Sequence, residues 1–232
     1  MIDFYALTSP NVQKIFLMLE ECGLQYNVKP VDVWAGKQYE PEFLKINPLA
    51  KVPAIVDHDG PAGKPYALIE SGAILLYLAE KTGKLIPHDP VKRYDTIQWL
   101  MVQVANVGPM FGQLVHWSKF APQPQEYGNM RYRSQVVKLY DLYEERLKSN
   151  PYIAGADYTI ADIAAWPWLR NVQLLGIDLG KFPAVKKYVE GIEARPAAKK
   201  MLSILPTLKS SRDNATDDNK DRFFSRGKYA RA

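Results

Sequence analysis

The sequence contains very little cysteine and histidine. Cys22 is the one cysteine among 232 residues, and the three histidines, His58, His88 and His116, are scattered along the chain. A single thiol excludes both an internal disulfide framework and a CxxC redox pair. The spacing of these four side chains matches no set of metal ligands, so we expect no metal site.

Long apolar runs are also missing. No stretch of about 18 apolar residues occurs, so the sequence predicts no membrane span. The segment Met1–Tyr5 carries an acid where a secretory signal would carry basic residues, and we therefore expect a cytoplasmic protein. Hydrophobic residues make up 47% of the chain and charged residues 24%, which favours one large folded domain or two modest ones.

The net charge of +5 is modest and unevenly placed. From Pro206 onward the chain holds seven Lys and Arg residues against four Asp residues, so this tail carries +3 of the total. Nucleic-acid binding would need a basic face on a folded element, and no predicted element has one. We expect residues 206–232 to be extended or disordered.

The first third of the chain alternates between strand and helix patterns. Ser9 is a good N-cap before Pro10, and Gly23 ends the helix that follows. The predicted elements are strand 2–7, helix 10–21, strand 26–33, short helix 40–46, strands 53–57 and 66–69 of a hairpin, and helix 71–81. This order predicts an α/β domain over residues 1–84, in which helices cover a small mixed sheet.

The remainder of the chain shows no strand pattern. A connector at 85–90 contains two prolines and is our candidate domain boundary. Thr159 and Asp162 form a capping box ahead of an apolar run. The predicted helices are 91–118, bent near Gly108 and Pro109, then 126–148, one after Thr159, one from 183 and one from 196. Residues 91–205 are therefore expected to form an all-α domain.

The segment Lys51–Val56 places a proline at the start of an apolar strand. A proline there gives up no hydrogen bond of the sheet, and an ordinary strand-opening proline is one interpretation. The X-Pro bond is also a common place for a cis peptide. A cis Val52–Pro53 bond would turn the backbone groups of Val52 away from the sheet, where they could pair with an extended peptide.

Three motifs in order resemble the glutathione transferase family: Lys51–Ala54, Glu70–Leu78 and Tyr158–Ala164. The resemblance implies a thioredoxin-like N-terminal domain, an all-helical C-terminal domain and a homodimer. Within the family, Thr8–Asn11 and Asn106–Gln113 resemble the bacterial Nu class, which is related to fungal nitrogen-regulator prion homologues. The tail after 206 lies outside this resemblance.

The resemblance also implies a site for glutathione, reduced or oxidised. Ser71 begins a helix, where a ligand carboxylate is favoured, and Glu70 would pair with the ligand's α-amine. Val52, with Pro53, would supply the backbone clamp. Gln38 would contact the glycyl carboxylate; by itself it would be called a surface glutamine.

Arg131 resembles a Nu-class residue that reaches ligand across the dimer. The alternative interpretation of Arg131 is an arginine that is solvated on a helix surface. The alternative interpretation of Glu70 is a solvated charge at the end of a strand. No resemblance implies a nucleic acid, a membrane or a metal as a partner.

The groups at the thiol end are less clearly marked. A side-chain donor near the start of the first helix would stabilise a thiolate, and the candidates are Tyr5, Thr8, Ser9 and Asn11. Ser9 suits the N-cap role, so the Nu resemblance favours Asn11, with Ser9 standing where that class often has threonine. Lys14, one turn further, is expected to be exposed. Cys22, at the far end of the helix, is expected to be a plain thiol.

The function that these residues predict is reduction of small disulfides with glutathione as the thiol source, with weak conjugating or peroxidase activity. One alternative is a transferase that conjugates glutathione to electrophiles. The other is a non-catalytic regulatory protein that keeps the fold and the glutathione site. Comparing the turnover of a small disulfide with that of a chlorinated aromatic electrophile would distinguish the disulfide reductase from the conjugating transferase.

Overall fold

The protein, described here by a computed structural model of residues 1–123 and 125–230, divides into two compact units. The first unit holds Met1–Ile74 together with the chain from Lys200 onward, and the second holds Leu75–Lys199. The sequence predicts an α/β domain followed by an all-α domain. The structure has this order, and the fold class is confirmed.

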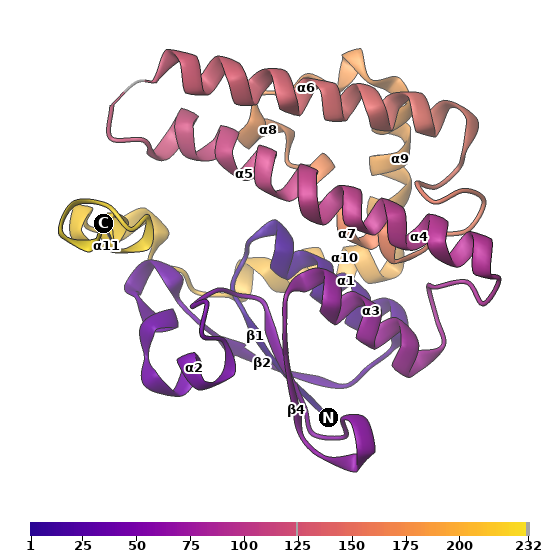
Figure 1. The fold of residues 1–232 in the computed structure, drawn as a ribbon, viewed down its shortest axis with the longest axis horizontal. Coiled ribbons are helices and arrows are strands. Elements are labelled where there is room, and N and C mark those ends of the chain that lie inside the picture. The colour runs from indigo at the N-terminus through magenta and orange to yellow at the C-terminus, as the bar shows by residue number, and fades with distance from the viewer. Residues whose placement is uncertain (124, 231–232) are drawn as a thin grey trace. The chain divides into compact units, whose positions relative to one another are not determined.

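The first unit is built on a four-stranded mixed sheet with the strand order β2-β1-β3-β4 (Figure 1). Strand β1 pairs in parallel with β2 and antiparallel with β3, and β3 and β4 form an antiparallel hairpin. The strands are β1 Ile2–Ala6, β2 Tyr26–Pro30, β3 Ala54–Asp57 and β4 Tyr66–Ile69. The helices of this part of the chain are α1 Pro10–Cys22, α2 Pro41–Ile46 and α3 Ser71–Thr82, which begins in the first unit and continues into the second.

Helix α1 begins and ends where its capping residues predict. The Ser9 hydroxyl accepts a hydrogen bond from the Val12 amide at 3.4 Å, and Gly23 takes the left-handed conformation at φ 69°. Phe16 of α1 meets Phe4 of β1 edge-on, with ring centroids 4.7 Å apart. Both rings are fully buried, so α1 is fixed to the sheet by its core face.

The second predicted strand is shorter than expected. Strand β2 ends at Pro30, and the chain then forms two 3-10 turns, η1 Val33–Ala35 and η2 Lys37–Tyr39. The cause is local, because the Asp32 carboxylate accepts a hydrogen bond from the Trp34 amide at 3.1 Å and so caps η1. Gly36 at φ 78° joins the two turns.

Among the described residues, the second unit contains helices and connecting turns but no β-strand. Two π turns, Gln103–Val107 and His116–Phe120, interrupt the predicted helix 91–118, and the first lies directly before Gly108. The helices are α4 Pro90–Val102, α5 Gly108–Val115, α6 Glu126–Ser149, α7 Ile160–Leu169, α8 Val172–Leu175, α9 Pro183–Glu193 and α10 Pro196–Ile204, which crosses into the first unit. Every residue of α7 is buried, so this helix is the core of the unit.

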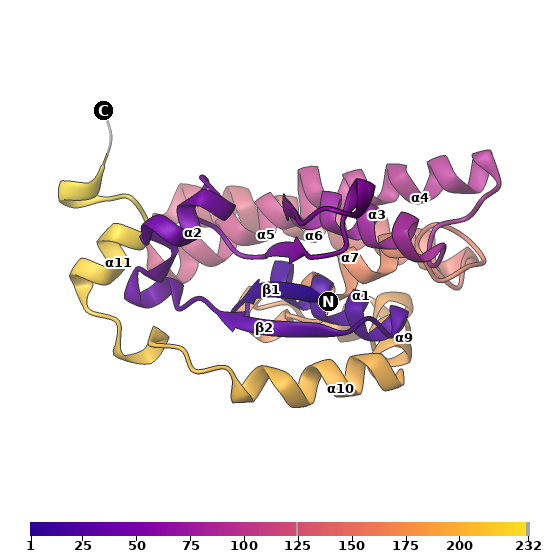
Figure 2. The ribbon, with the colours of Figure 1, turned by 90° about the horizontal axis from the view of Figure 1, so that it is seen from below.

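The tail beyond α10 is folded, unlike the extended or disordered end that its composition suggested. It contains the helix α11 Asp217–Phe223 and short 3-10 turns. Figures 1 and 2 both show α11 beside the segment that leads into α2, and Phe223 stacks on Trp34 of η1 with ring centroids 4.6 Å apart. Aromatic groups in the tail find an apolar partner there, which counting charges could not reveal.

Candidate functional site

The starts of α1 and α3 are joined by a buried hydrogen bond. The Lys14 ammonium donates to the Ser71 hydroxyl at 3.1 Å, and only 1% of Lys14 and 8% of Ser71 are exposed. Each helix start carries partial positive charge from its unpaired amides. The lysine therefore adds a third source of positive potential to a region that already favours anions.

Lys14 was expected to be exposed, and that expectation is wrong. Burial lowers its pKa from 10.5 to about 7, while the nearby Glu70 carboxylate opposes this shift. The signal was present in the sequence, because Lys14 shares a helix face with Leu17 and Met18, at i+3 and i+4. A lysine with a pKa of about 7 changes its charge within the pH range in which most enzymes work.

Glu70 lies directly before Ser71 with its backbone in the left-handed region, at φ 66°. This conformation is uncommon for a residue with a side chain. Its carbonyl accepts the first hydrogen bond of α3, from the Ile74 amide at 2.9 Å, while its side chain is exposed. The carboxylate is thus open to solvent beside a helix start.

The Val52–Pro53 peptide is cis, as predicted. Val52 lies outside β3, and no backbone hydrogen bond engages it within residues 1–123 and 125–230. The buried Asn47 holds the preceding turn, because its side chain donates to the Lys51 carbonyl at 2.7 Å and accepts from the Leu49 amide at 2.9 Å. Sequence reasoning missed Asn47, although an Asn-Pro pair is a typical turn signal.

Gln38 lies in η2 and is only 1% exposed, so it is not the surface glutamine that the residue alone would suggest. Its side-chain oxygen is buried and makes no hydrogen bond with any described residue. Buried polar atoms are nearly always paired, and each exception calls for an explanation. The unpaired oxygen could accept a hydrogen bond from a ligand N–H, whereas the side-chain nitrogen is the atom that could donate to a ligand carboxylate, so Gln38 is a candidate ligand contact.

The start of α1 carries the predicted thiol-end groups. Asn11 is half-buried in the first turn and Ser9 is exposed, and that turn contains no acid that would repel an anion. Tyr5 instead packs against Phe43, with ring centroids 5.8 Å apart, and burial raises its pKa. The ring of Tyr5 is thus engaged in packing against α2, whereas Ser9 and Asn11 stand at the N-cap and in the first turn of α1, where the amides of the helix start favour an anion.

Two of the singled-out residues lie apart from this cluster. Cys22 is buried at the other end of α1, about 16 Å along the helix from Asn11 at 1.5 Å per residue. Arg131 is exposed on α6 in the second unit. The residues that the first unit brings together are therefore those at the starts of α1 and α3 and in the segments that hold Gln38 and Val52.

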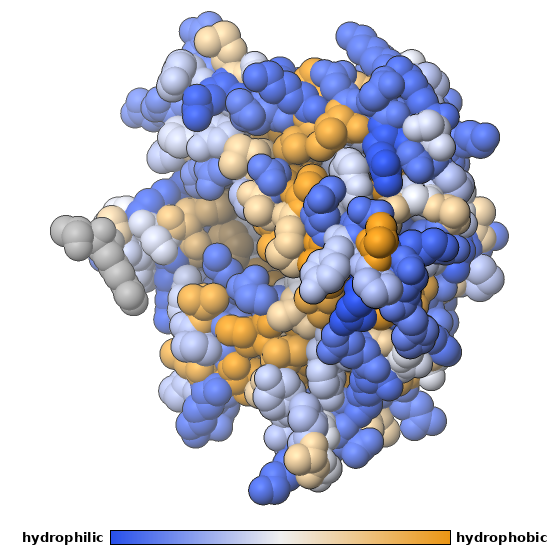
Figure 3. All heavy atoms as spheres, turned by 45° about the vertical axis from the view of Figure 1, so that its right-hand side comes forward, coloured by the Kyte–Doolittle hydropathy of each residue, from blue (hydrophilic) through white to orange (hydrophobic). Residues whose placement is uncertain are grey.

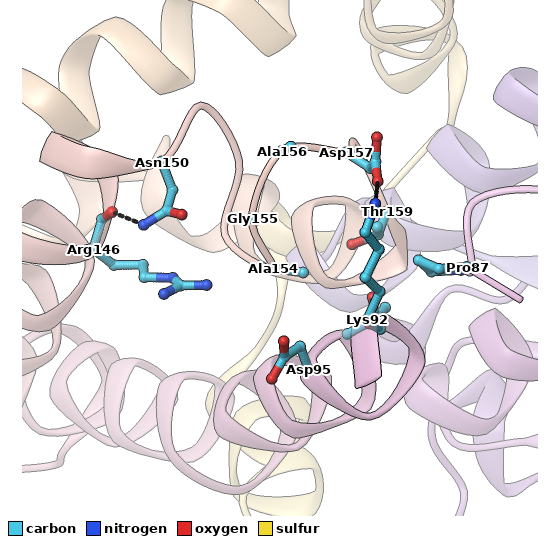
Figure 4. A pocket seen from close by; sticks show the side chains of 11 residues that line it. Pro87, Lys92, Asp95, Arg146, Asn150, Ala154, Gly155, Ala156, Asp157 and Thr159 are labelled. Atoms are coloured by element: carbon cyan, nitrogen blue, oxygen red, sulfur yellow. Dashed lines mark hydrogen bonds and ion pairs between the residues drawn. The ribbon is translucent and has the colours of Figure 1, made fainter. Parts of the chain in front are cut away.

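The second unit contains a polar hollow of about 260 Å³ with different chemistry (Figure 4). An ion pair between Lys92 and Asp157, 3.4 Å apart, crosses one side of it. Its lining is Pro87, Lys92, Asp95, Thr96, Arg146, Asn150, Ala154, Gly155, Ala156, Asp157 and Thr159. Among the described residues no cluster of three His, Cys, Asp or Glu side chains suits a metal ion, and no helix is both long and apolar enough to span a membrane.

Two family models match the chain. Residues 8–81 match the glutathione S-transferase N-terminal domain, and residues 95–196 match the glutathione S-transferase C-terminal domain. A disulfide-bond oxidoreductase of Escherichia coli K12, YfcG, is 48% identical over 85% of this chain and 92% of that protein. A second disulfide-bond oxidoreductase from the same organism, YghU, is 35% identical over 86% of this chain and 73% of that protein.

Solved structures agree with these matches. A glutathione transferase of Burkholderia graminis with two bound glutathione molecules per subunit has a TM-score of 0.83 and 43% identity, over 87% of each chain. A glutathione transferase of Pseudomonas putida with one bound glutathione disulfide per subunit has a TM-score of 0.82 and 39% identity, over 88% of this chain and 91% of that one.

Proposed function

Because the chain belongs to the glutathione transferase family, we propose that it reduces small disulfides with glutathione as the source of thiols. The observation that carries this proposal is the anion-favouring cluster at the starts of α1 and α3, where Lys14 meets Ser71 and no cysteine is present. The names of the similar E. coli proteins, disulfide-bond oxidoreductases, support the same reaction.

Glutathione would lie along the first unit as an extended peptide. Its glutamyl carboxylate would meet the Ser71 hydroxyl and amide at the start of α3, with the charge of Lys14 behind them. Its α-amine would pair with the exposed carboxylate of Glu70. Val52, beside Pro53, would hydrogen-bond the cysteinyl backbone, and Gln38 would take the glycyl carboxylate.

The sulfur would then lie at the start of α1. The Asn11 amide would donate to the thiolate, with Ser9 beside it, and the helix start would lower the thiol pKa. The thiolate attacks one sulfur of the substrate disulfide, the S–S bond breaks, and the departing thiolate takes a proton from water. A second glutathione thiolate attacks the mixed disulfide and releases glutathione disulfide and the second thiol.

We propose Arg131 as a contact to a carboxylate of that second glutathione. Its guanidinium is exposed and presents the planar donor fork that pairs well with carboxylates. Both attacking thiolates, the bound one and the one that resolves the mixed disulfide, come from glutathione, so the reaction needs a pool of the reduced tripeptide. We accordingly propose that the protein acts in the cytoplasm, where thiols are kept reduced.

The test compares two single variants of the intact protein. With hydroxyethyl disulfide as substrate, Cys22→Ala should keep its turnover within about twofold, because the buried thiol is not the nucleophile. Asn11→Ala should lose about tenfold, the equivalent of about 1.4 kcal/mol of lost stabilisation of the thiolate. An inactive Cys22→Ala would overturn the mechanism.

A parallel assay separates the alternatives. Turnover of 1-chloro-2,4-dinitrobenzene that exceeds disulfide reduction would identify a conjugating transferase. Glutathione binding by calorimetry without turnover of either substrate would identify a regulatory protein. Either result would reject disulfide reduction as the main activity.

We also propose that the protein forms a homodimer through α4. Val91 and Tyr94 on this helix are 72% and 71% exposed, and Met101 is 42% exposed. Apolar side chains do reach the surface among hydrophilic ones on the face drawn in Figure 3. Spacings of three and seven residues place the three side chains on one face of the helix, as expected of a surface that packs against a second copy.

A further inference from the structure

The chain beyond α10 forms an arm that the matched family models do not include. This C-terminal arm, residues 205–230, consists of α11 and the 3-10 turns Leu205–Thr207, Arg212–Asn214 and Gly227–Tyr229. It belongs to the same compact unit as the sheet and the cluster at the helix starts. Its contacts with that unit concentrate on one segment, residues 32–40, here called the 32–40 loop.

The first contact is polar and partly buried. The Asp32 carboxylate accepts hydrogen bonds from the Ser211 amide at 2.9 Å and from the Ser211 hydroxyl at 2.5 Å. Its other oxygen accepts from the Trp34 amide and caps η1. One carboxylate therefore shapes the loop and holds the arm, and charge-assisted bonds of this kind are among the stronger ones.

The second contact is aromatic. Phe223 stacks on Trp34 with ring centroids 4.6 Å apart and planes 28° apart, and Phe224 meets the same ring edge-on at 6.1 Å. No residue of η1 is buried, although η2 buries Gln38. The rings of the arm thus provide apolar packing for a stretch of chain that has little core of its own.

The third contact comes from Arg222, which reaches Tyr39, directly after Gln38, and Gly36, two positions before it. Its carbonyl accepts a hydrogen bond from the Tyr39 hydroxyl at 3.1 Å, and its guanidinium lies 4.6 Å from the centre of the Tyr39 ring. One of its nitrogens lies 3.1 Å from where a Cβ would stand at Gly36. The arm therefore touches the loop on both sides of Gln38 in the sequence.

We propose that the C-terminal arm, through Ser211, Arg222 and Phe223, positions the 32–40 loop and so sets the affinity for the glycyl end of glutathione. This inference rests on the proposed function, in which Gln38 takes the glycyl carboxylate. The side-chain oxygen of Gln38 is enclosed and makes no hydrogen bond with a described residue, so the packing of the loop around it sets the position of that oxygen. Without the arm, the loop would let the Gln38 amide take several orientations. Glutathione would then have to order the amide on binding, and this ordering would lower the affinity.

The experiment measures calorimetric binding of two ligands to the full chain. Glutathione carries the glycyl carboxylate, whereas γ-glutamylcysteine lacks it. Phe223→Ala should weaken glutathione binding about fivefold and leave γ-glutamylcysteine binding unchanged, because only the glycyl end depends on the loop. Lys228→Ala is the matched control, since Lys228 pairs with Asp218 inside the arm, and its two affinities should equal those of the unaltered protein.

Other results would overturn the inference. Equal weakening of both ligands would show that Phe223→Ala acts through general destabilisation, and no weakening would show that the loop keeps its shape without the arm. If Phe223→Ala does not fold, Ser211→Ala removes one of the two hydrogen bonds that Ser211 donates to Asp32 and should give the same selective loss. If the unaltered protein binds glutathione but the variants match it, only the role of the arm fails; if it binds no glutathione, both proposals fail.

Discussion

Lys14 is a lysine whose surroundings favour the uncharged amine. Burial removes the water that would solvate the ammonium and lowers its pKa to about 7, while the nearby Glu70 carboxylate favours the charged form. The Ser71 hydroxyl that it contacts can serve either form, because a hydroxyl both donates and accepts. A bound carboxylate at Ser71 would favour the charged form and raise the pKa.

This coupling predicts that the protein takes up protons when it binds glutathione. At pH 8 the free protein holds Lys14 mostly neutral, so a ligand that raises the lysine pKa must draw protons from the buffer. At pH 5.5 the lysine is protonated before and after binding, and no uptake is expected. Calorimetric titrations with S-methylglutathione in two buffers of different ionisation enthalpy measure the uptake without interference from the thiol.

The control is Lys14→Gln, which keeps a donor toward Ser71 but cannot titrate. It should bind S-methylglutathione more weakly at pH 5.5 and show no uptake at pH 8. Proton release, or uptake that persists in Lys14→Gln, would place the titrating group elsewhere.

The residues of the site differ in how far the sequence could place them. Ser9, Ser71 and Val52 follow from local rules for helix starts and for a proline that opens a strand. The burial of Lys14 follows from helical spacing, once the face that it shares with Leu17 is considered. Gln38 had no such signal, because its enclosure depends on residues outside its own segment.

At the scale of elements, the start of α7 is the most strongly determined feature of the second unit. The Asp162 carboxylate is fully buried and accepts from the Thr159 amide and the Ile153 amide, each at 2.8 Å. The Thr159 hydroxyl at 3.2 Å and the Tyr188 hydroxyl at 3.1 Å also donate to it. Burial raises the pKa of Asp162 to about 6, while these donors favour the ionised form.

Substitutions in this capping box should therefore have unequal effects. Thr159→Ala loses one cap acceptor and should lower the free energy of unfolding by about 1 kcal/mol. Asp162→Ala leaves several buried donors unpaired and should lower it by about 3 kcal/mol. Urea unfolding followed by circular dichroism measures both, and equal losses would contradict this account of the buried carboxylate.

Neither substitution should alter turnover per folded molecule, since no predicted ligand contact belongs to α7. Kinetics at a temperature well below the unfolding transition provide the control. A selective loss of activity in folded Asp162→Ala would make the capping box part of the site.

Helix ends were predictable because single residues determine them, whereas interruptions inside helices were not. Pro183 and Pro196 open α9 and α10, as their missing amides allow. Where a bend was expected near Gly108 and Pro109, the structure has a π turn directly before them, over Gln103–Val107. The length of such a turn depends on packing around it, which periodicity does not describe.

At the scale of the whole molecule, the folded arm is the largest departure from what the sequence predicts. Its charges suggested a solvated end, but Phe223 lies against Trp34, a residue 189 positions earlier in the chain. Local patterns cannot pair residues at such separation, so composition alone described the arm as free. The fold class, in contrast, followed from the order of strand and helix patterns.

The exposed apolar residues of α4 predict that two copies of the chain associate. Tyr94 is 71% exposed at the centre of the apolar face of α4, and a stable interface would bury about 800 Å² on each copy.

Tyr94→Glu places a charge in that interface, where desolvation would penalise it in both copies of a symmetric dimer. Sedimentation velocity at micromolar concentration should show the unaltered protein at twice the mass of the variant. Leu142→Glu, which changes an apolar residue on α6 that is 42% exposed, should remain dimeric and so assign the interface to α4. A Tyr94→Glu variant that sediments like the unaltered protein would remove α4 from the interface, because an unpaired glutamate buried in an interface would cost several kcal/mol of association free energy.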